Sequence, residues 1–361
     1  VASPFVLYLQ WGCAHAGAPM FSERGILHCT RSLLVFLSTF LLPPLDERGS
    51  LSQLNSWKGY QVSLTLLNGD HVGASYWDKS HLSTGVLHSF LTRLTPLCKF
   101  SVVAQTLFAV PLQQQPEEYT DVSGQRRFFF HPSNLHNILH LGDWDVDTST
   151  TTTPTLHMMA YIPSPDISPL TIRDLDSKAD SQSFLVPRTG GVVIHEPTMR
   201  GAAHAAPLSD ADARAVTGPF VMQLRQLLGL SDVRALADPP VELLPLPPCG
   251  LADWELDALL LLHTRSNMQF VAMSLSSFNS LVAELSNIPV YDHIIAQIEL
   301  SARLYEEAAA LLHAGRFSEA AAAARKAAIA AEVATMDAST LSQLYFPDEH
   351  KLAVYTPMFL P

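Results

Sequence analysis

The sequence predicts a mixed α/β fold (α+β), in which a mixed sheet with helical cover is followed by a C-terminal helical hairpin or bundle. Three observations predict this arrangement. Runs of alternating apolar and polar residues mark strands between residues 60 and 194, with helix-period segments among them. A proline-rich stretch, residues 238–248, then interrupts the chain. Beyond it, every periodic segment repeats with the 3.6-residue period of a helix.

The first 50 residues contain a strand-like run, Phe5–Leu9, and an apolar run, Leu33–Leu42. A helix that spans a bilayer needs about 20 apolar residues, and the second run has about half of them before Pro43 ends it. We therefore expect a core helix at this place.

The strand pattern is clearest from Tyr60 onward. Apolar residues from Tyr60 to Leu66 alternate with polar ones, and Asn68-Gly69 follows as a turn, so we expect a strand with one buried face. A helical segment over residues 82–97 and a second alternating run, Phe100–Phe108, extend the sheet. The polar residues 111–127 predict a loop.

Further elements complete a predicted body over residues 51–237. An alternating run predicts a strand over Leu156–Ile162, and Gly190–Ile194 is a short apolar strand. A helix follows, with Pro219 expected in its first turn and Gly229 closing it.

A helical segment is expected over residues 250–336. Asp253 is a candidate cap for a helix or helix pair that runs to Asn287, and Asp292 opens the next helix. Gly315 ends that helix, and Ser318 begins an alanine-rich one, so the two form a hairpin. The surrounding residues resemble half of a tetratricopeptide repeat, but a repeat fold needs about three units, which favours a single hairpin.

Composition excludes nucleic acid as a partner. The 361 residues are 48% hydrophobic and 16% charged, and the net charge is -12. The 22 lysines and arginines lie scattered along the chain and form no basic stripe that would release counterions from a phosphate backbone.

The strongest candidate for chemistry is a zinc site. The candidate residues are His131, His136 and His140. Of these, His136 and His140 are four residues apart and share a face if the segment is helical, as zinc ligands do. A zinc protease needs glutamate after the first histidine as its general base, and Asn137 stands there. A zinc-dependent hydrolase that uses His136 and His140 with a neighbouring aspartate remains the alternative function, and zinc bound to the purified protein would favour it.

A calcium site is not expected. Asp143, Asp145 and Asp147 have the spacing with which a calcium loop begins. Thr148 and Pro154 stand where that loop needs glycine and glutamate, so a solvated acidic turn is expected.

No cysteine has the surroundings of a catalytic nucleophile. Cys29 directly follows His28, and adjacent side chains in a regular element point apart. Cys98 lies in no protease-type sequence context, and no phosphate-binding or hydrolase motif is present. The sequence thus predicts no catalytic residue, no cofactor and no metal site, and favours an interaction protein.

Several strings of residues carry a family resemblance. In chain order they are Gly59–Asn68, Tyr76–Asp78, Tyr161–Pro163, Leu251–Asp257 (LADWELD), Leu285–Val290 (LSNIPV) and Leu344–Tyr355 (LYFPDEHKLAVY). Together they resemble the PIG-S family, a subunit of the GPI transamidase of the endoplasmic reticulum. The resemblance covers roughly residues 57–361, whereas residues 1–50 match poorly.

This resemblance implies a non-catalytic subunit that supports the attachment of GPI anchors to precursor proteins. The cysteine-protease-like PIG-K performs the reaction in that complex, and PIG-T, PIG-U and the GPI-attachment subunit are the other partners. The resemblance also implies a location at the endoplasmic reticulum membrane, with this region in the lumen. Val1 is expected to be an internal start, and residues 337–361 are expected to lead into a membrane helix beyond the chain.

No catalytic residue is carried over from the family. As interaction residues we predict Trp254, Tyr345, Phe346, Pro347 and Asp348, because large aromatic side chains stand there among turn-forming neighbours. The alternative is that they pack between the hairpin and the body. A third reading, a helical-repeat adaptor, predicts further repeats and no membrane helix in the flanking sequence.

Overall fold

The structure of the protein is a computed structural model. It describes residues 59–70, 73–78, 80, 83, 85–112, 114–120, 124–132, 153–173, 180–186, 189–198, 205–230, 249–284, 291–337 and 355. The elements confirm the predicted mixed α/β class with helices toward the C-terminus. The chain divides into two compact units, and the division after Leu256 falls inside helix α7 (Asp253–Glu284). The N-terminal segment discussed above, residues 1–50, lies outside the described residues.

A five-stranded sheet forms the centre of the first unit. Its order is β3 (Phe100–Leu107), β1 (Tyr60–Asn68), β6 (Thr155–Ile162), β10 (Gly190–Ile194) and β9 (Ser183–Val186). The first four strands are parallel, and β9 runs antiparallel to β10. The strands expected around residues 60–66, 100–108, 156–162 and 190–194 are therefore confirmed.

The expectation that β1 has one buried face is wrong, because all nine of its residues are buried. The strand lies between two other parallel strands in a sheet that is covered on both faces, so its polar residues are enclosed as well. One of them, Thr65, accepts a hydrogen bond from Gln105 Nε2 on β3 at 3.0 Å.

A second sheet corrects the predicted loop over residues 111–127. It contains β4 (Glu117–Thr120), β5 (Arg126–Phe130), β7 (Leu170–Arg173) and β8 (Asp180–Ser181). Phe130 and Ile172 of this sheet pack with Met159 and Val192 of the first sheet in one core cluster. The sequence hid β4 because three of its four residues are exposed, so no alternating apolar pattern marks it. The described part of this unit also contains three shorter elements. Strand β2 (Ser75–Tyr76) pairs with β11 (Ala206–Pro207), and η3 (Pro165–Ile167) is a single 3₁₀ turn.

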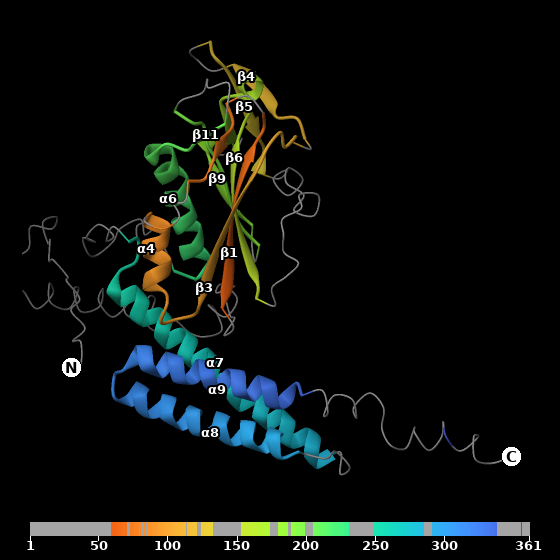
Figure 1. Ribbon diagram of the computed structural model, residues 1–361, viewed down its shortest axis with the longest axis vertical. Coiled ribbons are helices and arrows are strands. Elements are labelled where there is room, and N and C mark those ends of the chain that lie inside the picture. The colour runs from red at the N-terminus through yellow and green to blue at the C-terminus, as the bar shows by residue number, and fades with distance from the viewer. Residues whose placement is uncertain are drawn as a thin grey trace, which may run out of the picture. The chain divides into compact units, whose positions relative to one another are not determined.

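Two helices, α4 (Val86–Arg93) and α6 (Asp210–Leu227), lie side by side on one side of the five-stranded sheet (Figure 1). The prediction that Pro219 begins a helix is wrong, because α6 begins nine residues earlier and Pro219 lies inside it. Ser209 caps the earlier start, since its side chain accepts the Asp212 amide. Burial of Phe220 next to the proline offsets the lost helix hydrogen bond.

The second unit is helical and contains most of α7 together with α8 (Asp292–His313) and α9 (Phe317–Thr335). The predicted hairpin of α8 and α9 is confirmed, and Gly315 joins them with a φ of 72°, which favours glycine. Alanine side chains of α9 fill the interface, among them Ala324, which packs with Ala308 of α8. The Ser301 hydroxyl of α8 donates to the Ala327 carbonyl of α9 at 2.9 Å.

Candidate functional site

Open α/β sheets bind ligands outside the carboxyl ends of their strands, where the strand order reverses. In this sheet the reversal is at β1, because the chain passes from β1 to β3 on one side and later adds β6 and β10 on the other. The carboxyl ends of β1, β6 and β10 are therefore the first place to examine for a site.

At the end of β1 this place is filled by the chain itself. The Asn68 amide donates to the Ser75 carbonyl at 2.9 Å and to the Leu107 carbonyl at 3.2 Å, and its oxygen accepts the Ser75 N–H at 2.8 Å. Gly69 lies so close to β6 that an added Cβ would be 2.8 Å from the Tyr161 hydroxyl. A buried amide thus occupies the carboxyl end of β1 on the side of β3, and the Gly69 backbone closely approaches β6.

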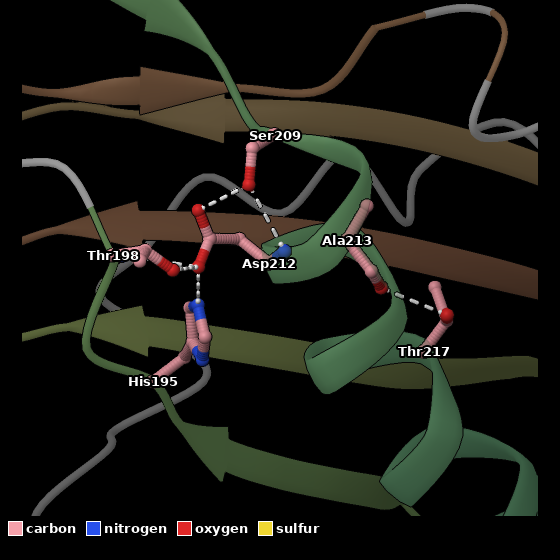
Figure 2. Close-up of polar contacts among 6 residues, drawn as sticks. All are labelled: His195, Thr198, Ser209, Asp212, Ala213 and Thr217. Carbon is pink, nitrogen blue, oxygen red and sulfur yellow. Dashed lines mark hydrogen bonds and ion pairs between the residues drawn. The ribbon is translucent and has the colours of Figure 1, made fainter.

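A polar cluster stands at the end of β10, where the chain turns into α6 (Figure 2). The Asp212 carboxylate is its centre. Asp212 Oδ1 lies 3.1 Å from His195 Nε2 and accepts the Thr198 N–H at 3.1 Å and the Thr198 hydroxyl at 2.7 Å. Asp212 Oδ2 accepts the Ser209 hydroxyl at 2.6 Å. The side chain of Asp212 is only 6% exposed.

These contacts determine the charge of the carboxyl group. Burial alone would raise the pKa of Asp212, but hydrogen bonds from Ser209, Thr198 and His195 outweigh burial and lower the pKa to about 2. Asp212 is therefore a carboxylate at any physiological pH, and it accepts hydrogen bonds without exchanging a proton.

Serine, histidine and aspartate invite comparison with a hydrolytic triad, but the order of contacts differs. In a triad the histidine lies between the other two and takes the proton from the serine. Here Asp212 lies between His195 and Ser209, and Ser209 both donates to it and accepts its amide N–H as the helix cap. The arrangement fastens the first turn of α6 to the end of β10 and leaves Ser209 without a base.

A second buried ion pair connects α6 with the first turn of α7. Arg225 donates to Glu255 through two bonds, at 2.6 and 2.9 Å, and also to the Gly250 carbonyl at 2.7 Å. Glu255 Oε2 accepts the Ala252 N–H at 2.9 Å and so serves the start of α7. This corrects the expectation that Asp253 caps the helix, since Asp253 is its first residue and pairs with Arg93.

Sequence reasoning missed both clusters. The available signals were Ser209 three residues before Asp212, the spacing of a capping box, and a glutamate and an arginine at positions that turn out to be buried. Arg225 and Glu255 are 30 residues apart in the sequence, so no local pattern predicts that they form a buried ion pair.

Of the predicted interaction residues, only Trp254 is described. It is partly buried in the first turn of α7, beside Glu255. Tyr345, Phe346, Pro347 and Asp348 lie outside the described residues, as do the zinc candidates His136 and His140 and the acidic turn at residues 143–147.

Two features are absent from the described residues. In the part of the chain that the structure describes, no three histidine, cysteine, aspartate or glutamate side chains are grouped so that they could hold a metal ion. Within the same residues, none of the helices has the length and apolar character needed to cross a bilayer.

Comparison with known proteins gives consistent matches. The model of a family described as "Phosphatidylinositol-glycan biosynthesis class S protein" (PIG-S) matches residues 39–361. A rat protein named "GPI-anchor transamidase component PIGS" is 31% identical over 363 residues, which are 97% of this chain and 64% of the rat protein. The mouse protein of that name is 31% identical over 314 residues, 85% of this chain and 56% of its own.

A more distant match comes from fission yeast, Schizosaccharomyces pombe. Its protein named "GPI transamidase component PIG-S homolog" is 24% identical over 306 residues, which are 83% of this chain and 51% of the yeast protein. The chain thus spans between half and two thirds of the length of these relatives.

Proposed function

The chain belongs to the PIG-S family, and from this premise we propose that it is the lumenal body of a non-catalytic subunit of the GPI transamidase. In this proposal the complex attaches GPI anchors to precursor proteins at the endoplasmic reticulum membrane. The observation that carries the proposal is the family match, which extends over residues 39–361 and includes both compact units.

The geometry of the two buried clusters supports a role in assembly. Asp212 and Glu255, the two most enclosed carboxylates described above, each accept several hydrogen bonds that fix the beginning of a helix. Groups held in this way stabilise a rigid surface, and a rigid surface lowers the entropic cost of binding other subunits. The proposed partners are PIG-K, which would carry the catalytic nucleophile, PIG-T, PIG-U and the GPI-attachment subunit.

The principal test is complementation in cells that lack the corresponding subunit. Full-length protein containing this region is expected to restore GPI-anchored proteins at the cell surface and to co-purify the other transamidase subunits. If it restores no surface display and retrieves none of those subunits, the proposal is wrong.

The variant His195→Gln distinguishes a role in assembly from a role in the catalytic reaction. His195→Gln is expected to keep surface display within about twofold of wild type, because His195 contributes only one of the hydrogen bonds to Asp212. Loss of display from a complex of normal composition would show that His195 takes part in the reaction. The matched control is Thr198→Val, which removes a hydroxyl from the same carboxylate oxygen.

The aromatic segment Tyr345–Asp348 and Trp254 remain proposed contact residues for partner subunits. Phe346→Ala is expected to reduce co-purification of at least one subunit while the isolated protein keeps its thermal stability. Unchanged co-purification and unchanged surface display would contradict a contact at Phe346. Met273→Ala, at an exposed apolar side chain of α7, is the control.

A further inference from the structure

One edge of the five-stranded sheet has no role in the two buried clusters, and no described strand pairs with its outer side. β3 is the outermost strand at one end of the sheet, next to β1 (Figure 1). It pairs with β1 over all eight residues of Phe100–Leu107, without a bulge. Among the residues that the structure describes, none forms a backbone hydrogen bond with the opposite side of β3.

The register shows which backbone groups face outward. The Tyr60 N–H donates to the Lys99 carbonyl at 2.9 Å, and in a parallel ladder the groups of alternate residues turn the same way. The backbone groups of Ser101, Val103 and Gln105 therefore face β1. Those of Phe100, Val102, Ala104 and Thr106 face away from the sheet and form a row of alternating donors and acceptors.

Natural sheets protect such edges with charged side chains, prolines or bulges. β3 has no such protection, since its sequence, FSVVAQTL, contains neither a charge nor a proline. Val102 is 40% exposed and Val103 is 46% exposed, and successive side chains of a strand point to opposite faces. Within the described ranges, neither face of the sheet is fully covered at Val102 and Val103, and no strand pairs with the outward side of β3.

We propose that β3 is a docking edge at which an extended, uncharged segment of another subunit adds a further strand to the sheet. A row of backbone donors and acceptors is complementary to another extended backbone, and Val102 and Val103 favour apolar neighbours on both faces. A second copy of this chain is disfavoured as the occupant, because each copy carries a net charge of -12 and the two would repel. The inference rests on the proposed function, from which it takes the other subunit.

The direct test is Val102→Pro in the full-length protein, expressed in cells that lack the subunit. Proline removes the outward N–H of Val102 and leaves the inward groups of Ser101 and Val103 in place, so the pairing with β1 is retained. The expected result is an at least tenfold loss of one co-purified subunit. Val102→Ala, which keeps the N–H, is the matched control and is expected to retain that subunit within about twofold.

The outcomes separate this inference from the proposed function. If Val102→Pro retrieves all subunits as Val102→Ala does, the docking edge is wrong and the proposed function stands. If wild-type protein retrieves no subunit, both are wrong. If Val102→Pro assembles normally but binds less precursor protein, the occupant is the precursor, and the proposal of a subunit segment is overturned.

Hydrogen exchange decides the question even if Val102→Pro fails to fold. In the isolated wild-type protein the amides of Val102 and Ala104 are expected to exchange at least a hundredfold faster than those of Ser101 and Val103. In the assembled complex all four are expected to be protected. Equal exchange of Val102 in the isolated and assembled protein would overturn the proposal, whether the amide is exposed in both or is already covered by the protein's own chain.

Discussion

The α/β body and the helical unit bury different kinds of side chain. In the body, charged and amide groups such as Asn68, Asp212 and the Arg225–Glu255 pair lie in the interior and connect segments far apart in sequence. In the described part of the helical unit the interior consists largely of alanine, with Ser301 as a buried polar residue that bridges two helices. The body depends on specific polar partners, and the hairpin depends on the small size of its side chains.

This difference predicts different responses to substitution. Removing one polar partner in the body leaves the other buried without compensation, which is costly. Removing a polar group from the hairpin costs less, but adding volume to it costs more, because helices in contact through alanine have no room for larger side chains.

The largest effect is expected for Arg225→Leu in the body. Glu255 is only 2% exposed, so the substitution leaves a buried carboxylate without its charge partner. We expect this to destabilise the fold by about 3–5 kcal/mol. Urea denaturation of the single and double variants measures this effect. Arg225→Leu/Glu255→Leu is expected to regain at least half of the loss, and a double variant as unstable as the sum of the single ones would contradict coupling between the two residues.

The next effect is a dependence on pH. The Asp212 pKa is about 2 in the folded protein and 3.8 as its ordinary value, which corresponds to roughly 2 kcal/mol. Because the folded pKa is the lower one, this stability is present above about pH 4 and is lost as the pH falls through 2. Asp212→Asn is therefore expected to be less stable than wild type at pH 7, and the difference is expected to shrink below pH 4.

The matched control for Asp212 is Asp292→Asn, at an exposed acid in the first turn of α8. It is expected to change stability by only a few tenths of a kcal/mol through the helix dipole. The free energies of unfolding of Asp212→Asn and wild type are compared from pH 7 to pH 2. A difference that stays constant over this range would show that the cluster does not stabilise the charge of the carboxylate.

The hairpin is expected to respond to added volume. Ala324→Leu places a larger side chain at a fully buried contact with Ala308 and is expected to cost about 1–3 kcal/mol in thermal unfolding. Ala302→Leu, at an exposed position of α8, is expected to stay within about 0.5 kcal/mol of wild type. Equal stability of the two variants would show that the helices do not pack through α9 as described.

The smallest effect is expected for Ser301→Ala in α8. The substitution removes one hydrogen bond, from Ser301 Oγ to the Ala327 carbonyl, and keeps the small size, so a loss of about 1 kcal/mol is expected. Ser89→Ala in the body is the control, because Ser89 makes a comparable bond to a backbone carbonyl at an exposed position. If Ser301→Ala lost more stability than Ala324→Leu, the hairpin would depend more on its buried hydrogen bond than on the small size of its side chains.

The class of the fold was predictable because β1, β3 and β6 each carry an alternating run of apolar residues and β10 is a short apolar run. The small-residue hairpin was predictable because Gly315 stands between two helical patterns. These signals involve residues that are close together in the sequence, so they can be recognised without knowing how the rest of the chain folds.

The misses have tertiary causes. The second sheet escaped prediction because β4 exposes most of its residues, and Pro219 suggested a helix start because proline inside a helix is rare. The Asp212 cluster joins His195, just after β10, with Thr198 of the following segment and with the start of α6, and no local sequence pattern indicates that they meet. Of the predicted interaction residues, Trp254 alone is described, so the segment Tyr345–Asp348 stays a prediction.

Asn68 can be regarded as a ligand that is covalently attached to its own binding site. Its side chain places one amide against two carbonyls and one N–H, which is the set of contacts that free acetamide would make. Attachment to the chain supplies the amide at a high effective concentration. Replacing Asn68 with alanine would therefore remove all three of these hydrogen bonds at the carboxyl end of β1, which is the end of a strand where open α/β sheets bind their ligands.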